Sequence, residues 1–245
     1  MSLDLAVNLA ASLIAFVTGW LARNALMYYR GSRPVARLWR IDARKPVTAV
    51  VGRVNGGKTL WEADALAAMN IRLSLARELK IHSIGTVSSA SFRMAAHAED
   101  NVVVIGGPAM NEVWETYASR LDVPYDFRIV EDRYRIVARE GDVSYGETRN
   151  AEVKQDHALV ILAPNPFEPG SRVVMLAGCG YLATLAAPVV FSPDFARTLN
   201  RRFDTSKPLA LILSVEDVRG YMPRPEIVAG KQFAQSTRRG TGSLR

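Results

Sequence analysis

The sequence predicts an α/β fold in which helices cover both faces of a mostly parallel sheet, preceded by a single transmembrane helix. Apolar, β-branched runs of strand length alternate with stretches in which apolar residues recur at helical spacing. Such runs are typical of strands buried on both faces, and their alternation with helices is typical of parallel strands joined by crossovers. A separate apolar run without charge lies near the amino end of the 245 residues.

The amino-terminal run, LAVNLAASLIAFVTGWLA, covers residues 5–22 and forms a helix about 27 Å long, close to the ~30 Å hydrocarbon core of a membrane. A cleavable signal peptide would need a positive charge before this run, where only Asp4 stands. A buried helix of a soluble domain is the other alternative, because Asn8, Ser12 and Thr18 dilute the apolar character. We assign residues 1–29 to a transmembrane helix.

A basic segment follows the apolar run. Residues 23–45 contain seven arginines and lysines and one acid, whereas no basic residue precedes the run. We assign residues 30–45 to a basic juxtamembrane linker, and the positive-inside rule places the N-terminus outside and the following domain in the cytoplasm. The prediction is a single-pass protein of the inner (cytoplasmic) membrane. Membrane lipid is an expected partner, since each basic residue near anionic headgroups contributes about 1 kcal/mol.

Charge and composition exclude several classes of function. The net charge of +7 is concentrated in residues 23–45 (+6) and 230–245 (+4), which leaves residues 46–229 slightly negative, so no nucleic-acid surface is expected. A single cysteine, Cys179, excludes an intramolecular disulfide. The three histidines are far apart in sequence, so no metal site is predicted. No residue stands out as a catalytic nucleophile or general base.

We place one cytoplasmic domain at residues 46–229 and a disordered basic tail at residues 230–245. Within the domain, the apolar runs predict strands at residues 47–51, 81–87, 101–105, 158–163, 172–177 and 209–215. The helical patterns cover residues 59–80, 109–121 and 181–191. Residues 126–149 alternate polar and apolar positions around two turn candidates, Glu131-Asp132 and Glu140-Gly141-Asp142, which predicts a short antiparallel excursion of two or three strands.

Three predicted strands run directly into glycine: at Gly52, at Gly106-Gly107 and at Gly178. Glycine lets a backbone approach a ligand closely, and the following helix directs unpaired N–H groups at the same place. The carboxyl ends of parallel strands meet at one edge, so these turns predict a phosphate or carboxylate site there. Each turn alone also fits a helix start or close helix–sheet packing, and Asn165, between two prolines, also fits an ordinary rigid loop.

The stretch GRVNGGKT, residues 52–59, resembles the phosphate loop (Walker A motif) of P-loop NTPases. The resemblance implies that Lys58 contacts phosphates and that the Thr59 hydroxyl holds Mg²⁺. Hydrolysis also needs an acid after an apolar strand, and the candidates are Glu216 and Asp217. These acids lie two residues beyond their apolar run, so we predict phosphate binding rather than hydrolysis.

The order of these segments also resembles bacterial Rossmann-like nucleotide-sensing and signalling domains fused to a membrane helix. The resemblance covers residues 47–217 and rests on the IGGPxxN turn, the charged ribbon, the strand ending in NPF and the glycine turn before ATLAA. It implies a Rossmann-like three-layer domain that binds a regulatory ligand and needs no lysine in the first glycine turn. The positions it implies for the ligand are Gly106, Gly107, Asn111, Asn165 and Gly178.

The leading hypothesis is a membrane-anchored sensor that binds a nucleotide or another phosphorylated ligand, with or without Mg²⁺, and signals by self-association or within a membrane complex. The alternatives are a membrane-anchored P-loop NTPase and a structural subunit of a membrane assembly. The candidate ligand-binding residues are Gly52, Asn55, Gly56, Gly57, Lys58, Thr59, Gly106, Gly107, Asn111, Asn165 and Gly178.

Overall fold

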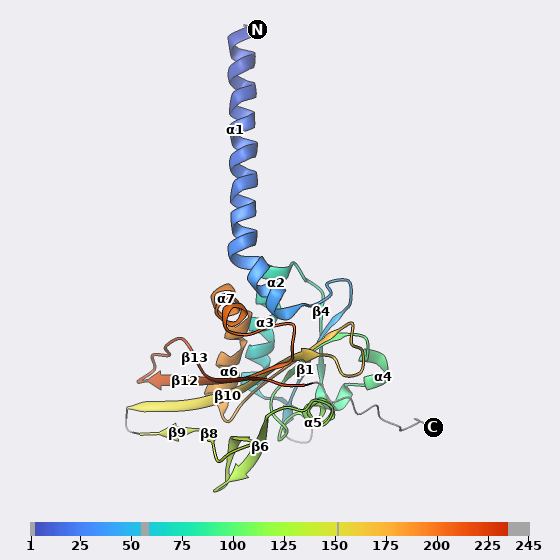
Figure 1. The fold of residues 1–245 in the computed structure, drawn as a ribbon, viewed down its shortest axis with the longest axis vertical. Helices are drawn as coiled ribbons and strands as arrows, with labels where there is room; N and C mark the ends of the chain where they lie inside the picture. The colour runs from blue at the N-terminus through green and yellow to red at the C-terminus, as the bar shows by residue number, and fades with distance from the viewer. Residues whose placement is uncertain (1–2, 55–58, 151, 235–245) are drawn as a thin grey trace.

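The computed structural model describes residues 3–54, 59–150 and 152–234 of the chain (Figure 1). Helix α1 (Leu3–Met27) projects away from the rest of the molecule and continues through a π-helical turn, η1 (Tyr28–Ser32), into α2 (Arg33–Trp39). This helix is long and apolar enough to cross a membrane, with a mean hydropathy of 1.4 in its apolar window. No part of that window is buried in the fold, so α1 is not a core helix of the domain.

Helix α2 lies where the sequence analysis expected a linker, and it packs into the core. Val35, Leu38 and Trp39 are fully buried, and the Trp39 ring stacks on Phe191. Their spacing of three and four residues places them on one face of the helix. The folded domain therefore includes α2 and begins before residue 46, because the same segment that carries the basic charges also carries an apolar stripe.

The central sheet has the strand order β13-β12-β10-β11-β5-β1-β4, with the short β9 paired to β10. Its strands are β1 (Val47–Val51), β4 (Ile84–Ser88), β5 (Asn101–Ile105), β9 (Thr148–Arg149), β10 (Val153–Pro164), β11 (Arg172–Gly178), β12 (Leu209–Val218) and β13 (Glu226–Gln232). Strands β11, β5, β1 and β4 are parallel to one another. The sheet is therefore mostly parallel, as predicted.

Strand β10 runs antiparallel to both of its neighbours, β11 and β12, and β13 runs antiparallel to β12. Residues 158–163 were predicted as a strand of a mostly parallel sheet, and their strand is an antiparallel exception in that sheet. A continuous apolar run shows that a strand is buried on both faces, and it carries no information about the direction of the strand. This reversal moves the carboxyl end of β10 to the opposite edge of the sheet.

Helices and an antiparallel ribbon of strands, formed by residues 125–146, cover the two faces of the sheet (Figure 1). One core cluster joins the sheet to α2, α3 (Glu62–Leu79), α6 (Tyr181–Ala186), the 3₁₀ turn η4 (Ala187–Phe191) and α7 (Pro193–Arg202). The second cluster, on the other face, joins it to α5 (Glu112–Ala118) and neighbouring segments, which include η3 (Ser89–Ser91) and α4 (Met94–His97). The result is the three-layer α/β arrangement that the alternating pattern predicts.

The antiparallel excursion is confirmed as a separate three-stranded sheet of β6 (Tyr125–Val130), β7 (Arg133–Ala138) and β8 (Ser144–Gly146). The predicted turn residues Glu131 and Asp132 both have positive φ, at 51° and 58°, as a two-residue hairpin turn requires. At the carboxyl end, β13 extends to Gln232, so the first residues of the predicted tail form a strand. Residues 235–245 lie outside the described part of the chain.

Candidate functional site

The three glycine turns lie side by side, at the carboxyl ends of adjacent parallel strands. Val51 and Leu176 are both in register with Ile105, so Gly52, Gly106 and Gly178 lie at the ends of three neighbouring strands, at one edge of the sheet. We call this the carboxyl edge. Convergence of the turns is what the sequence analysis expected from a parallel sheet, and in open α/β sheets this edge is the usual place for a ligand.

A cavity of about 120 Å³ opens at the carboxyl edge, and we call it the edge pocket. Its lining combines glycine turns, four aromatic rings, a carboxylate and a few small polar groups. The residues are Trp61, Asp64, Gly106, Gly107, Pro108, Ala109, Met110, Phe127, Tyr134, Gly178, Cys179, Gly180, Tyr181 and Thr184. The cavity is smaller than the 300–1,000 Å³ typical of drug-sized ligands, so it can take a ring-sized part of a molecule.

Asp64, in the first turn of α3, directs its carboxylate at two of the glycine turns. The side chain is buried, and Oδ2 accepts a hydrogen bond of 3.2 Å from the Gly52 amide. A Cβ atom at Gly52 would lie 2.6 Å from that oxygen. A Cβ atom at Gly106, which has a φ of 91°, would also clash with the Asp64 carboxylate. The two glycines therefore make space for a carboxylate. Burial raises the pKa of Asp64 to about 6, partly offset by the Gly52 hydrogen bond.

A second carboxylate occupies the start of α6. Asp156, fully buried on β10, accepts hydrogen bonds from the amides of Gly180 at 3.1 Å and Ala183 at 2.9 Å. Burial raises the pKa of Asp156, while the bonds from the Ala183 and His157 amides oppose the shift. Asp156 thus fills the position in which an anionic ligand would meet the amino end of α6.

Main-chain amides at the glycine turns are therefore engaged within the fold. The amides of Gly52 and Gly180 bond to the two carboxylates, the Gly106 amide bonds to the Leu176 carbonyl at 2.9 Å, and the Gly178 amide bonds to Thr184 Oγ1 at 3.0 Å. At these four positions, contrary to the prediction from the sequence, the main-chain amides are not free to donate hydrogen bonds to a phosphate. Side chains from α3, α6 and β10 take the place that the sequence analysis assigned to an anion.

Asn111 is a structural residue rather than a group facing the pocket. It is fully buried, and its side-chain amide donates to the carbonyls of Ile105 at 2.8 Å and Val50 at 3.2 Å. Its Oδ1 accepts from the Val113 amide and caps α5, which begins at Glu112 rather than at the predicted residue 109. All three bonds tie α5 to the ends of two strands, so the prediction that Asn111 contacts a ligand does not fit its position.

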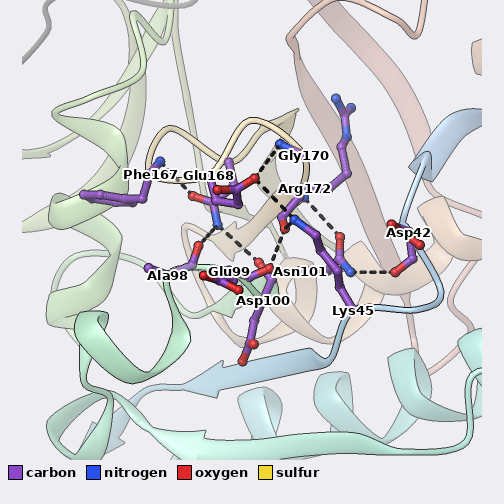
Figure 2. A network of polar contacts seen from close by, with 12 residues as sticks. Asp42, Lys45, Ala98, Glu99, Asp100, Asn101, Phe167, Glu168, Gly170 and Arg172 are labelled. Carbon is purple, nitrogen blue, oxygen red and sulfur yellow. Dashed lines mark hydrogen bonds and ion pairs between the residues drawn. The ribbon is translucent and has the colours of Figure 1, made fainter.

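Asn165 lies at the opposite edge of the sheet, because β10 is antiparallel. Its amide donates to the carbonyls of Ala98 and Asp100 at 3.2 Å each, and its oxygen accepts from Phe167 at 3.0 Å. Figure 2 shows the partner residues Ala98, Asp100 and Phe167 near Asn101, at the start of β5. Asn165 therefore joins two loops and contributes nothing to the edge pocket.

The GRVNGGKT stretch folds differently from a phosphate loop in the parts that the structure describes. Strands β2 (Arg53–Val54) and β3 (Thr59–Leu60) form an antiparallel pair, and α3 begins only at Glu62. A phosphate loop instead leads from a strand directly into a helix that starts at its Lys-Thr pair. The predicted helix at residues 59–80 was therefore wrong at its start. Residues 55–58, which include Asn55, Gly56, Gly57 and Lys58, lie outside the described residues.

The acids proposed for a metal lie far from this hairpin. Glu216 and Asp217 are on β12, four strands from β1, which corresponds to about 19 Å at the usual strand spacing. The carboxylate of Glu216 accepts from Gln155, and that of Asp217 accepts from the Gly220 amide. Within the described residues, no group of three or more His, Cys, Asp and Glu side chains could hold a metal ion.

Comparison with protein-family models, with curated proteins and with solved structures finds no match to this chain. The resemblances to Rossmann-like sensing domains and to P-loop NTPases stay predictions. Functional inference for this chain therefore depends on the geometry of its sites.

The edge pocket also contains residues that the sequence analysis did not select. Trp61 precedes α3, Phe127 and Tyr134 come from the ribbon, and Tyr181 begins α6. Phe127 lies over Gly107, with ring atoms 3.9 Å from the place of a Cβ atom. Burial and the nearby Asp156 raise the pKa of Cys179 to about 12, which disfavours the thiolate form. Aromatic rings around a carboxylate suit a planar group that carries N–H donors.

Proposed function

We propose that this chain is a membrane-anchored sensor whose α/β domain binds the base of a nucleotide-type ligand in the edge pocket. The observation that carries the proposal is the combination of aromatic rings and the buried Asp64 carboxylate in one cavity at the carboxyl edge. The rings offer stacking surfaces, and the carboxylate accepts hydrogen bonds from amino or ring N–H groups. The phosphates would extend out of the cavity, since its volume suits the base alone.

The buried acid gives the strongest support for a ligand. Asp64 is buried although burial opposes its ionisation, and such a group in a cleft is a functional-site candidate. The buried Asp64 carboxylate lacks the hydrogen bonds that water gives it in the unfolded chain. The N–H donors of a bound ligand would replace those bonds. We therefore expect binding to favour ionised Asp64 and to lower the pKa of this residue.

In this proposal α1 crosses the inner membrane once, with the N-terminus outside and the domain in the cytoplasm. The basic residues after the apolar run support this orientation. Ligand binding would shift the balance between two arrangements of the domain, with self-association as the output. The size of that shift is set by the difference in ligand affinity between the two arrangements.

The proposal is tested by thermal unfolding of the full chain in detergent micelles with nucleobases, nucleosides, nucleotides and ribose 5-phosphate. A ligand at a hundred times its dissociation constant stabilises the folded state by about 2.7 kcal/mol. We expect a base-bearing compound to raise the melting temperature and ribose 5-phosphate to leave it unchanged. Asp64→Asn should remove the effect, whereas Asp132→Asn, on the exposed ribbon turn, should retain it.

Three results would contradict the sensor proposal. Stabilisation by ribose 5-phosphate alone would move the ligand site to a phosphate-binding segment. A melt unchanged by every compound, together with copurification of a membrane partner, would favour the structural-subunit alternative. Magnesium-dependent nucleotide hydrolysis abolished by Lys58→Ala would favour the NTPase alternative, which the β2–β3 hairpin and the remote position of Glu216 do not support.

A further inference from the structure

A pocket of about 790 Å³ lies at the junction of α1 with the folded domain. It is lined by the end of α1 and the η1 turn, by the end of α3, and by α7. We call it the junction pocket. Four basic side chains line it, Arg30, Arg77, Lys80 and Arg197, against a single acid, Glu78. The lining therefore carries a formal charge of +3, contributed by segments that are far apart in the sequence.

The membrane-proximal end of the junction pocket lies at the depth of the headgroup layer, and its far end, at Arg30, lies just beyond that layer. If residues 5–22 span the hydrocarbon core, the pocket residues Asn24 to Arg30 lie about 3–12 Å beyond its edge. The headgroup region on each side of a bilayer is about 5–7 Å thick. Tyr28, exposed beside the pocket, belongs to the residue type that is enriched at this level.

The segments that line the junction pocket are held together by specific hydrogen bonds and close packing. The guanidinium of Arg197 donates to the Arg30 carbonyl and so ties α7 to η1. Arg77 Nε donates to the buried Glu78 carboxylate at 2.6 Å, and a Cβ atom at Gly31 would lie 2.9 Å from the other Glu78 oxygen. Gly31 therefore lets η1 pack closely on α3. The π-helical turn, closed by a bond from the Arg33 amide to the Tyr28 carbonyl, lies at this contact.

The junction pocket also has an apolar side, formed by Met27, Leu79 and the ring of Tyr28. A lining that combines cationic and apolar side chains suits an amphipathic anion. Arginine and lysine pair with phosphate oxygens, and the apolar side chains suit the glycerol and first acyl carbons of a phospholipid. Free phosphate would use only the cationic part.

From this geometry we propose that the junction pocket binds the phosphate headgroup of an anionic phospholipid. The inference rests on membrane insertion of α1 and does not depend on the ligand of the edge pocket. A bound headgroup would hold α3 and α7 against the membrane-proximal end of α1. The bound lipid would thereby fix the orientation of the domain relative to the bilayer. General electrostatic attraction between the basic segment and the membrane would not fix this orientation.

The test uses the full chain in nanodiscs of phosphatidylcholine, to which phosphatidylglycerol is added in steps. Retained lipid is counted by native mass spectrometry. We expect saturable retention of one phosphatidylglycerol per chain. The double variant Arg30→Gln with Lys80→Asn should weaken retention about 30-fold, the factor expected for two basic residues near an anionic surface. Asparagine suits the left-handed conformation at Lys80, whose φ is 59°, and both changes leave the Arg77–Glu78 pair in place.

The matched control is Arg72→Gln with Arg201→Gln, which removes the same charge from exposed positions on α3 and α7 outside the junction pocket. We expect this control to bind the lipid within about twofold of the original chain, since the effect of an exposed charge is screened by salt.

Equal loss of lipid in both double variants would show diffuse attraction and overturn the proposal. Binding of glycerol 3-phosphate as tight as that of the lipid would assign the pocket to a free phosphate. A chain that does not enter nanodiscs would overturn the anchor and the lipid site together, while the thermal-shift test of the edge pocket would still stand.

Discussion

At the scale of single residues, the Asp64 carboxylate reduces stability above pH 6, because burial raises its pKa from 3.8 to about 6. The folded chain then holds this proton more tightly than the unfolded chain. The favourable contribution is complete below pH 3.8 and is lost as the pH rises through 6. A shift of this size corresponds to about 3 kcal/mol.

We expect Asp64→Asn to stabilise the chain at pH 7.5 by about 2 kcal/mol, because the amide keeps an acceptor for the Gly52 amide and cannot ionise. The loss of stability between pH 4 and 6 should become shallower. Urea unfolding of both chains across pH 4–8 measures this difference. Asp132→Asn serves as the control and should follow the original pH profile. An Asp64→Asn chain with the original slope would show that Asp64 does not titrate in this range.

Asp64 was missed because its sequence context is ordinary. An acid in the first turn of a helix is commonly explained by the helix dipole, and nothing near Asp64 in sequence indicates burial. Asn111, in contrast, was selected from its place after a strand and predicted to contact a ligand. A polar side chain after a strand suggests a ligand, but its partners here are the carbonyls of Val50 and Ile105.

At the scale of elements, α6 depends on a cap from another part of the chain. Asp156 on β10 accepts from the amides of Gly180 and Ala183, which lie 24 and 27 residues further along the sequence. Helix α6 is only six residues long, so its own hydrogen bonds contribute little. The carboxylate therefore fixes how α6 meets the carboxyl edge.

We expect Asp156→Ala to lower the free energy of unfolding by about 3 kcal/mol, since it removes the acceptor of three partly or fully buried amides, those of His157, Gly180 and Ala183. Asp156→Asn keeps one acceptor oxygen and should lose less than half as much. Glu152→Ala, at an exposed position nearby, is the control and should stay within about 0.5 kcal/mol. Denaturant unfolding measures all three, and a neutral Asp156→Ala would refute the capping role.

The direction of β10 shows why elements can be predicted more easily than their arrangement. Every residue from Ala158 to Ala163 is buried, so the apolar run identified the strand correctly. Its direction depends on the path of the ribbon before it and on pairing with β11 and β12. Because β10 is antiparallel, Asn165 lies at the edge opposite the predicted site, and Asp156 lies at the edge where that site was predicted.

At the scale of the whole molecule, α3 contributes to both pockets. Trp61 and Asp64 lie at its amino end in the edge pocket, and Arg77 and Lys80 lie at its carboxyl end in the junction pocket. Its 18 residues make a rod about 27 Å long. The proposed ligand and the proposed lipid would therefore contact the same rigid helix.

We expect the full chain to remain with membranes after alkaline carbonate extraction. Ile14→Asp, in the middle of the apolar run, should release most of the chain, because an acid at the centre of a membrane helix costs about 3 kcal/mol. Ile14→Leu keeps the apolar character and should behave like the original chain. Immunoblots of pellet and supernatant measure the distribution. Full retention of Ile14→Asp would argue against insertion of this helix.

Local sequence patterns predicted the apolar amino-terminal helix, the alternating α/β pattern, the ribbon with its turn at Glu131-Asp132, and the meeting of glycine turns at one edge. These features follow from periodicity and backbone preference, which act over a few residues. The burial of α2 was missed although its apolar stripe is a local pattern. The direction of β10 and the filling of the glycine turns by Asp64 and Asp156 depend instead on contacts between segments far apart in the chain, and no local pattern encodes them.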